Sequence, residues 1–433
     1  MEKQSPHPGW FELPVEQFWE LLRKALGDAL QQAEAKFADI VGISYSAQAN
    51  TFVLLDAFDR PLTPLVFWTD RRAESVPETW TAFSDTDSFR RVAGFGGISV
   101  ESAVTKWRWF REHRPELWSR VRWHLTISDY LTHVLTGERA ADASTSALLG
   151  LYHLHDRRWW GDALAAFDVD AQKLPTPMAP GSFCGRTRKP DTPGTGLGLP
   201  DGIPFAAGAL DHYGAAIGAG LDVLAEASIS TGTVLAALCT VDRVEPLADC
   251  YHGPQFDGDK GGYYRLAFDP DGAGKLDRFQ REFAPDCAIE KLIGEAALLA
   301  PGTRSSATPW TPEWGAGRAT AVRGLLEEIA WAQRALLHTV AGGRSLGRVS
   351  ATGGGARSEA WLAIKADIIG APILTLVCPE RACLGAAVFA AVAAGWYANA
   401  AEAARAMVRP GREFVPDAAR HAAYHALRGN LNR

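Results

Sequence analysis

The hydrophobic pattern near the N-terminus changes from a helical period to short, strand-like runs. Apolar residues recur every three or four positions between Val15 and Leu30, which predicts an amphipathic helix with one buried face. Three apolar runs rich in β-branched and aromatic residues follow at 40–45, 51–55 and 65–68, and each predicts a strand. A helix followed by strands predicts an α/β domain with a mixed sheet.

The middle of the first half is mainly helical in pattern. Residues 102–151 show helical spacing, and Asp142 and Ser144 are candidate caps for one of these helices. Residues 174–204 are rich in proline and glycine and show no period, which predicts a long surface connection.

The second half predicts another α/β domain. A strand–turn–strand pattern begins at Ala227, a long helix is predicted over 322–340, and a strand over 348–351. We place the domain boundary after the glycine-rich segment that ends at Gly220, so that the expected domains are 1–222 and 223–433. Further helices are expected after Gly354, Leu384 and Pro416.

The composition is that of a globular protein from a reducing compartment. The chain has 433 residues, of which 47% are hydrophobic and 22% charged, which excludes a disordered protein. Its 44 basic and 50 acidic residues form no basic stripe, so we expect no nucleic-acid partner. Its six cysteines include no Cys-x-x-Cys pair and no zinc-like spacing, which favours the cytoplasm and gives no protein metal ligand.

We expect neither a signal peptide nor a membrane span. Residues 1–10 are polar and lack an apolar core. The uncharged stretch 382–401 is long enough to cross a bilayer, but it consists mostly of alanine and lacks the leucine, isoleucine and phenylalanine density of a spanning helix. It therefore predicts a buried helix.

Two glycine-containing turns are candidates for binding phosphate. Gly353-Gly354-Gly355 follows a predicted strand and precedes a predicted helix, an arrangement that presents free backbone N–H groups to a nucleotide. Ser230-Thr231-Gly232-Thr233 adds hydroxyl donors to a similar turn. The alternatives are a tight turn that needs a positive φ angle at 353–355 and an ordinary β-hairpin turn at 230–233.

Asp211 is the candidate general base. It lies between an apolar strand end and a glycine-rich helix, where we expect its carboxylate to be partly desolvated near the helix N-terminus. The alternative is a helix-capping role without chemistry. The neighbouring His212 is more typical of a structural histidine.

Asp70 belongs to a second candidate cluster, Trp68-Thr69-Asp70-Arg71-Arg72-Ala73. A carboxylate beside two guanidinium groups is able to bind a polyol, and it is equally able to form a buried ion pair that stabilises the domain. Lys106 is interpreted as a structural contact. The paired carboxylates of a glycoside hydrolase stay open only because acidic residues are common.

Taken together, these segments resemble the FGGY carbohydrate kinases, the sugar and polyol kinases of the actin-like ATPase fold. The resemblance covers nearly the whole chain, and the order of the short motifs makes it specific. The matching segments are Pro8-Gly9-Trp10-Phe11-Glu12, Ser46-Ala47-Gln48, Trp68 to Ala73, Lys106-Trp107-Arg108-Trp109-Phe110, Asp129-Tyr130-Leu131, Leu135-Thr136-Gly137-Glu138, Gly208-Ala209-Leu210-Asp211, Ser230 to Thr233, Gly353 to Ser358 with Ala366-Asp367, and Leu384-Gly385-Ala386-Ala387.

The resemblance implies an α/β protein of two actin-like, ribonuclease H-like domains, with mixed sheets flanked by helices, that close on a cleft. It implies a sugar or polyol bound mainly by the N-terminal domain, ATP with Mg²⁺ bound mainly by the C-terminal domain, and Asp211 as the base that takes the proton of the attacking hydroxyl. The substrate-binding positions that it implies are Gln48, Asn50, Asp70 and Asp211. The nucleotide-binding positions that it implies are Thr231, Gly232, Thr233, Gly354, Gly355, Ala356 and Ser358.

Three departures from the family pattern affect the functional interpretation. The sequence contains no Asp-x-Gly-Thr, the first phosphate loop of the family, and its absence leaves neighbouring strands with an unpaired edge. The usual segment before the long helix of the C-terminal domain looks shortened between Pro301 and Gly324. Ala49-Asn50 replaces the usual Met-His after Gln48, so the sugar contacts differ from the xylulose-type pattern.

Two functions follow as alternatives. The first is an ATP-dependent sugar or polyol kinase whose encoded start lies upstream of Met1, with weak activity expected of the 433 residues alone. The second is a non-catalytic relative that binds a sugar or nucleotide without transferring phosphate. The particular sugar and the oligomeric state stay open, a homodimer among the alternatives.

Overall fold

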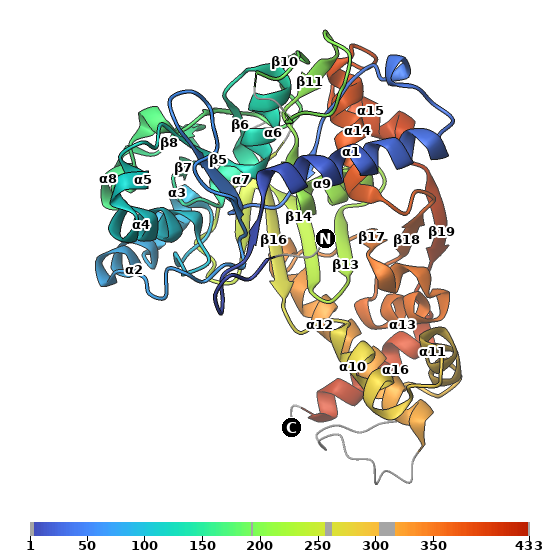
Figure 1. Cartoon of the computed structure of the whole chain (residues 1–433). Coiled ribbons are helices and arrows are strands. Elements are labelled where there is room, and N and C mark those ends of the chain that lie inside the picture. The colour runs from blue at the N-terminus through green and yellow to red at the C-terminus, as the bar shows by residue number, and fades with distance from the viewer. Residues whose placement is uncertain (1–3, 192–193, 256–261, 303–316, 432–433) are drawn as a thin grey trace. The chain divides into compact units, whose positions relative to one another are not determined.

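The computed structural model describes residues 4–191, 194–255, 262–302 and 317–431. The chain divides into two compact units. Figure 1 shows the whole chain coloured by residue number. The first unit contains residues 1–218, 242–264 and 382–404, and the second contains residues 219–241, 265–381 and 405–433. The sequence analysis did not anticipate that residues 242–264 and 382–404 belong to the first unit.

Both units contain helices and strands. The helices are α1 (Val15–Gln32), α2 (Glu78–Ser84), α3 (Asp87–Ala93), α4 (Ala103–His113), α5 (Pro115–Trp118), α6 (Ile127–Thr136), α7 (Ala143–Ala147), α8 (Gly161–Ala166), α9 (Asp211–Gly218), α10 (Gly274–Phe283), α11 (Ile289–Ala297), α12 (Arg318–Ala341), α13 (Glu359–Ile369), α14 (Arg381–Ala393), α15 (Ala400–Met407) and α16 (Ala418–Leu431), with 3₁₀ turns η1 (Phe37–Asp39), η2 (Ala171–Lys173) and η3 (Gly354–Arg357). The strands are β1 (Glu12–Leu13), β2 (Ser46–Ala47), β3 (Phe52–Leu55), β4 (Leu65–Val66), β5 (Trp123–Thr126), β6 (Ala140–Asp142), β7 (Tyr152–His153), β8 (Arg158–Trp159), β9 (Thr176–Met178), β10 (Phe183–Arg186), β11 (Pro204–Ala206), β12 (Ala209–Leu210), β13 (Ala227–Thr231), β14 (Leu235–Val241), β15 (Tyr251–Pro254), β16 (Tyr263–Asp269), β17 (Val349–Thr352), β18 (Ile373–Leu376) and β19 (Pro410–Phe414).

The first helix forms where the apolar period predicts it. Its Val15, Phe18 and Trp19 side chains are buried in a core of the first unit, and Pro14 precedes it as the N-cap residue. Proline favours a helix start because its fixed φ angle suits the first turn and its missing N–H is not needed there. The Trp19 indole N–H donates to the Tyr130 hydroxyl at 3.4 Å, which ties α1 to α6.

The strand predicted at 40–45 is shifted toward the C-terminus. β2 occupies Ser46–Ala47 and pairs in parallel with β12, with Ser46 opposite Ala209 and Ala47 opposite Leu210. Within residues 40–45, Ile43 makes an isolated bridge to Phe205. Gln48 directly follows β2 and Asp211 directly follows β12, so these two predicted site residues come after two neighbouring strands.

In the second unit, strands β16, β14, β13, β17, β18 and β19 lie side by side in one sheet, and Figure 1 shows β17, β18 and β19 in that order. β13 is antiparallel to β14 and parallel to β17, which is parallel to β18. Buried residues of α10, α11, α12 and α13 form the core of this unit. The predicted mixed sheet flanked by helices is confirmed.

Several sequence expectations need correction. The helical region 102–151 contains the strands β5 and β6, and Asp142 caps α7 whereas Ser144 lies inside that helix. The predicted connection 174–204 holds β9 and β10. The stretch 382–401 forms most of α14 and the start of α15 instead of one helix. Most of the segment expected to be shortened, residues 303–316, lies outside the described residues.

No helix in the described part of the chain is long and apolar enough to cross a membrane.

Candidate active site

The two predicted phosphate turns lie together at one edge of the sheet in the second unit. β13 and β17 are parallel, with Ser230 opposite Thr352, so their carboxyl ends meet at the same edge. β13 ends at Thr231 and its turn begins at Gly232, and the glycine turn after β17 begins at Gly353. A Cβ atom on Gly353 would lie 2.6 Å from the Thr231 carbonyl oxygen, and one on Gly355 would lie 2.6 Å from Thr231 Cγ2. Glycine is required at both positions because the turns pack directly on each other.

A third loop holds the turn 231–234 from another side. The Gly272 N–H donates to the Thr233 carbonyl at 3.0 Å, and the Ala273 N–H donates to the Gly232 carbonyl at 2.9 Å. Beside this loop a cavity of about 330 Å³ is lined by Asp271 and by residues of α10 and α12. The turn is thus fixed by backbone hydrogen bonds next to an open space.

Both turns keep an open side. A Cβ atom on Gly354 would have no heavy atom within 4 Å, and one on Gly232 would have only the Val234 carbonyl oxygen at 3.6 Å. Gly354 and Thr233 are exposed. The space beside Gly354 and Gly232 is therefore open to a ligand, while the Gly232 N–H itself donates to the Val234 carbonyl at 3.2 Å.

The glycine turn leads into helix α13. Gly353 has a φ angle of +80°, a conformation that residues with a side chain rarely adopt. The tight turn that was the alternative at this glycine is therefore present. Ala356 is buried in η3, and the Ser358 hydroxyl caps α13 by accepting from the Trp361 N–H at 3.4 Å. The Ser358 hydroxyl is therefore a helix cap, in addition to the nucleotide-binding position that the resemblance implies.

Thr231 has two polar partners that the sequence analysis missed. Its hydroxyl accepts from the Gln333 side-chain amide at 2.8 Å and from Lys365 Nζ at 2.6 Å. The Lys365 ammonium also lies 4.0 Å from the centre of the Trp361 ring. Burial lowers the pKa of Lys365 to about 7. A lysine inside the apolar pattern of α13 is the signal that could have identified it.

Asp211 lies in the first unit, where β12 ends and α9 begins. Its carboxylate is exposed, which corrects the expected partial desolvation, and Oδ1 accepts from the His212 N–H at 2.7 Å. The residue before it is well fixed, since the Leu210 N–H donates to the buried Ser144 hydroxyl at 2.8 Å. Asp211 is thus an accessible carboxylate on a rigid backbone.

Asp142 and Asp129 carry two buried carboxyl groups, and the first is connected to β12 through the Ser144 hydroxyl. Asp142 accepts hydrogen bonds from the Ser144 and Thr145 hydroxyls and from their backbone N–H groups. Asp129 is also buried, and its Oδ1 has no hydrogen-bond partner among the described residues. Burial raises the pKa of Asp142 and raises that of Asp129 to about 7.

Gln48 and Asn50 follow β2, and they differ in how they are engaged. Gln48 is half-buried. Asn50 has a positive φ angle of 59°, its amide donates to the Leu148 carbonyl at 3.2 Å, and its carbonyl accepts from the Ala103 N–H at 3.0 Å. The Asn50 side chain therefore links β2 to α4 and α7, while Gln48 is left as the polar side chain at the strand end.

Asp70 forms the buried ion pair that was the structural alternative. Its side chain is fully buried, and its two oxygens accept from Arg72 Nε at 2.9 Å and Arg72 Nη2 at 2.8 Å. The Arg72 backbone N–H donates to Oδ1 at 3.0 Å and the Phe11 N–H donates to Oδ2 at 2.7 Å, which makes four hydrogen bonds in all. Lys106 is likewise structural, since its Nζ donates to the Phe67 and Trp68 carbonyls at 2.8 and 3.0 Å.

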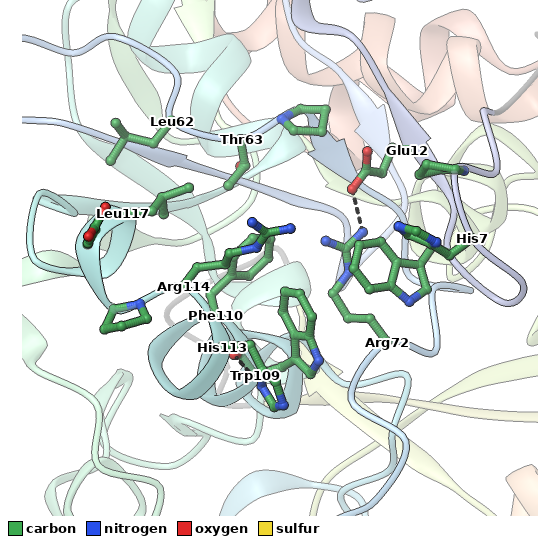
Figure 2. Close-up of a pocket in the computed structure, with 15 residues that line it drawn as sticks. His7, Glu12, Leu62, Thr63, Arg72, Trp109, Phe110, His113, Arg114 and Leu117 are labelled. Atoms are coloured by element: carbon green, nitrogen blue, oxygen red, sulfur yellow. Dashed lines mark hydrogen bonds and ion pairs between the residues drawn. The ribbon is translucent and has the colours of Figure 1, made fainter.

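Arg72 also lines a separate cavity of about 630 Å³ in the first unit, shown in Figure 2. Figure 2 shows Glu12 paired with Arg72, at 2.6 Å, and Trp109 and Phe110 beside them. None of the predicted site residues lines this cavity among the residues described.

Comparison with known proteins assigns the family. Residues 1–218 match the N-terminal domain of the FGGY family of carbohydrate kinases, and residues 281–394 match its C-terminal domain. The chain therefore belongs to the FGGY family of carbohydrate kinases.

Curated and solved relatives agree with this assignment. The chain is 26% identical to a xylulose kinase of Bacillus subtilis, over 97% of this chain and 87% of the relative. It is 27% identical to a glycerol kinase of Methylibium petroleiphilum, over 95% of this chain and 88% of the relative. A solved xylulose kinase from Lactobacillus acidophilus superposes with a TM-score of 0.83 at 20% identity, over 98% of this chain and 89% of that one. The chain thus has the actin-like fold of this family.

Proposed function

We propose that this protein transfers the γ-phosphoryl group of ATP to a hydroxyl group of a sugar or polyol, with Asp211 as the general base. The observation that carries the proposal is the adjacency of the turns 231–233 and 353–356, which are far apart in sequence and share an open side. A phosphate cradle and an accessible carboxylate are the two elements that such a transfer needs from the protein.

The nucleotide side of the proposal rests on the second unit. Backbone N–H groups near Gly232 and Thr233 bind the phosphates, and the glycine turn admits the adenosine at Gly354, where a Cβ atom would have no heavy atom within 4 Å. When bound with ATP, Mg²⁺ neutralises charge that develops on the phosphates. The described residues contain no cluster of three or more His, Cys, Asp or Glu side chains that could hold a metal ion.

The acceptor side rests on Asp211. Its carboxylate is exposed and has only its neighbour's N–H as a hydrogen-bond donor among the described contacts, so an acceptor hydroxyl is able to reach it. Asp211 accepts the hydroxyl proton as the oxygen attacks the γ-phosphorus and ADP leaves. Gln48, on the strand paired with β12, offers an amide to a neighbouring hydroxyl of the substrate.

The relatives that suggest the substrate class are a xylulose kinase and a glycerol kinase. We propose a small molecule with several hydroxyl groups as the acceptor. A panel of ketoses, sugar acids and polyols, with ADP release as the readout, tests this directly.

The decisive variant is Asp211→Asn, with Asp201→Asn as the control because Asp201 is an exposed carboxylate of the same unit. We expect Asp211→Asn to lower kcat by about 10²–10⁴-fold, the range for loss of a general base. Asp201→Asn should leave kcat unchanged. Equal kcat values for Asp211→Asn and the unchanged protein would remove Asp211 from the mechanism.

The alternative is a relative that binds a sugar or nucleotide without transferring phosphate. Nucleotide binding without ADP release, for every acceptor in the panel, would support this alternative. Turnover that Asp211→Asn abolishes would exclude it.

A further inference from the structure

Lys365 is a fully buried lysine without a carboxylate partner among the described residues. Its Nζ donates to the Thr231 hydroxyl and faces the Trp361 ring. Burial of a charged group costs free energy unless an opposite charge compensates it. Stability of the fold alone therefore does not explain why an ammonium group occupies this position.

The charged groups on the neighbouring elements are engaged elsewhere. On α13 itself, Asp367 pairs with Arg420 of α16. On α12, Glu327 pairs with Arg323, and Arg334 donates to the Ile368 carbonyl. These contacts leave Lys365 with one neutral hydrogen-bond acceptor and one aromatic ring. In the free protein, burial lowers the pKa of Lys365 to about 7, so that both protonation states are populated at neutral pH.

Thr231 connects this lysine to the phosphate turn. A hydroxyl group offers two acceptor sites and one donor proton. Lys365 and Gln333 use the two acceptor sites of Thr231, which leaves its proton for a further acceptor. Thr231 directly precedes Gly232, and Gly355 packs against its methyl group. The Lys365–Thr231 pair thus lies immediately beneath the two turns.

We propose that the phosphates of the bound nucleotide are the counter-charge of Lys365, which positions the Thr231 hydroxyl and takes up a proton when the nucleotide binds. The inference rests on the proposed function, since it assumes that the turns at 231–233 and 353–356 hold the nucleotide. A phosphate chain attracts the ammonium form and not the neutral amine. Nucleotide binding and protonation of Lys365 therefore favour each other.

The coupling has a predictable size. If the bound phosphates raise the pKa of Lys365 by about one unit, the protonated protein binds nucleotide about tenfold more tightly than the neutral one. Proton uptake on binding should be largest between the pKa of the free protein and that of the complex, at pH 7–8, and should vanish near pH 6, where Lys365 is already charged.

The test is calorimetric titration of the full chain with Mg²⁺ and a non-hydrolysable ATP analogue at pH 7.5, in two buffers of different ionisation enthalpy. Lys365→Met keeps the length of the side chain and removes its charge, and Lys291→Met is the control because Lys291 is exposed in the same unit. We expect proton uptake by the unchanged protein and by Lys291→Met. At pH 7.5 only part of the unchanged protein carries the proton, so for Lys365→Met we expect about threefold weaker binding, no proton uptake and an unfolding midpoint that is unchanged or higher.

A second variant separates positioning from packing. Thr231→Val should weaken binding to a similar extent, and Lys365→Met in the Thr231→Val background should add little, because the lysine acts through this hydroxyl. Independent, multiplying losses would contradict the proposal, as would Lys365→Met protein that binds with unchanged affinity and proton uptake. If the unchanged protein binds no nucleotide, the proposed function fails and this inference fails with it. If only the effect of Lys365 is missing, the proposed function stands.

Discussion

Replacing Asp70 with asparagine tests whether this carboxylate stabilises the fold or binds the substrate. Asp70 and Arg72 have side-chain exposures of 0% and 1%, and the two groups share two hydrogen bonds. Removing one partner of a buried ion pair costs about 3–5 kcal/mol because the other charge stays buried without compensation. Arg72 keeps Glu12 as a partner at 2.6 Å, so we expect a loss near the lower end, about 3 kcal/mol.

Urea unfolding followed by tryptophan fluorescence measures this loss. The chain has 15 tryptophans, so the signal reports global unfolding, and Trp10 and Trp109, with ring centres 4.3 and 5.4 Å from the Arg72 guanidinium, contribute to it. We expect Asp70→Asn to unfold at a lower urea concentration and to keep its KM for the sugar. Asp201→Asn is the control. An unchanged unfolding midpoint together with a KM raised tenfold or more would refute the structural role and return Asp70 to the substrate site.

Two further predictions concern packing and pH. Gly355→Ala places a methyl group 2.6 Å from Thr231 Cγ2 and 3.0 Å from the Trp361 ring, so we expect a loss of about 1–3 kcal/mol in unfolding free energy and weaker nucleotide binding. Gly354→Ala, whose methyl group meets nothing within 4 Å, should leave stability unchanged, and equal losses in the two variants would contradict the packing of the turns. Asp129 carries a proton in the folded state up to a pKa of about 7 and loses it near 4 when unfolded, so its contribution lowers stability by about 1.4 kcal/mol per pH unit as the pH rises from 4 to 7. Asp129→Asn should remove this dependence in urea titrations at several pH values, and an unchanged slope would show that Asp129 does not carry that proton.

Elements with a strong period or a clear cap were predictable from the sequence. The apolar face of α1, the long helix α12 and the strand–turn–strand of β13 and β14 all appear where the pattern places them. The short strands were harder to place, because their positions depend on partners far along the chain. β2 pairs with β12, more than 150 residues later, and it lies just past the apolar run that suggested it.

The candidate site was predictable where its chemistry depends on backbone shape. Glycine at 353 and 355 signals a close approach, and the parallel register of β13 and β17 explains why the two turns meet. The sequence could not distinguish a substrate-binding Asp70 from an ion-paired one, since only the structure shows Arg72 Nε and Nη2 on its oxygens. Lys365 was missed because its partner Thr231 is 134 residues away.

The most direct test of the central claim is the stoichiometry of the reaction. The purified chain is incubated with Mg²⁺, ATP and each acceptor of the panel, and ADP and phosphate ester are both quantified, with Asp211→Asn in parallel. The account predicts one phosphate ester for every ADP with at least one sugar or polyol, and loss of both products in Asp211→Asn. ADP formed without any phosphate ester, or equal ester formation by Asp211→Asn, would contradict it.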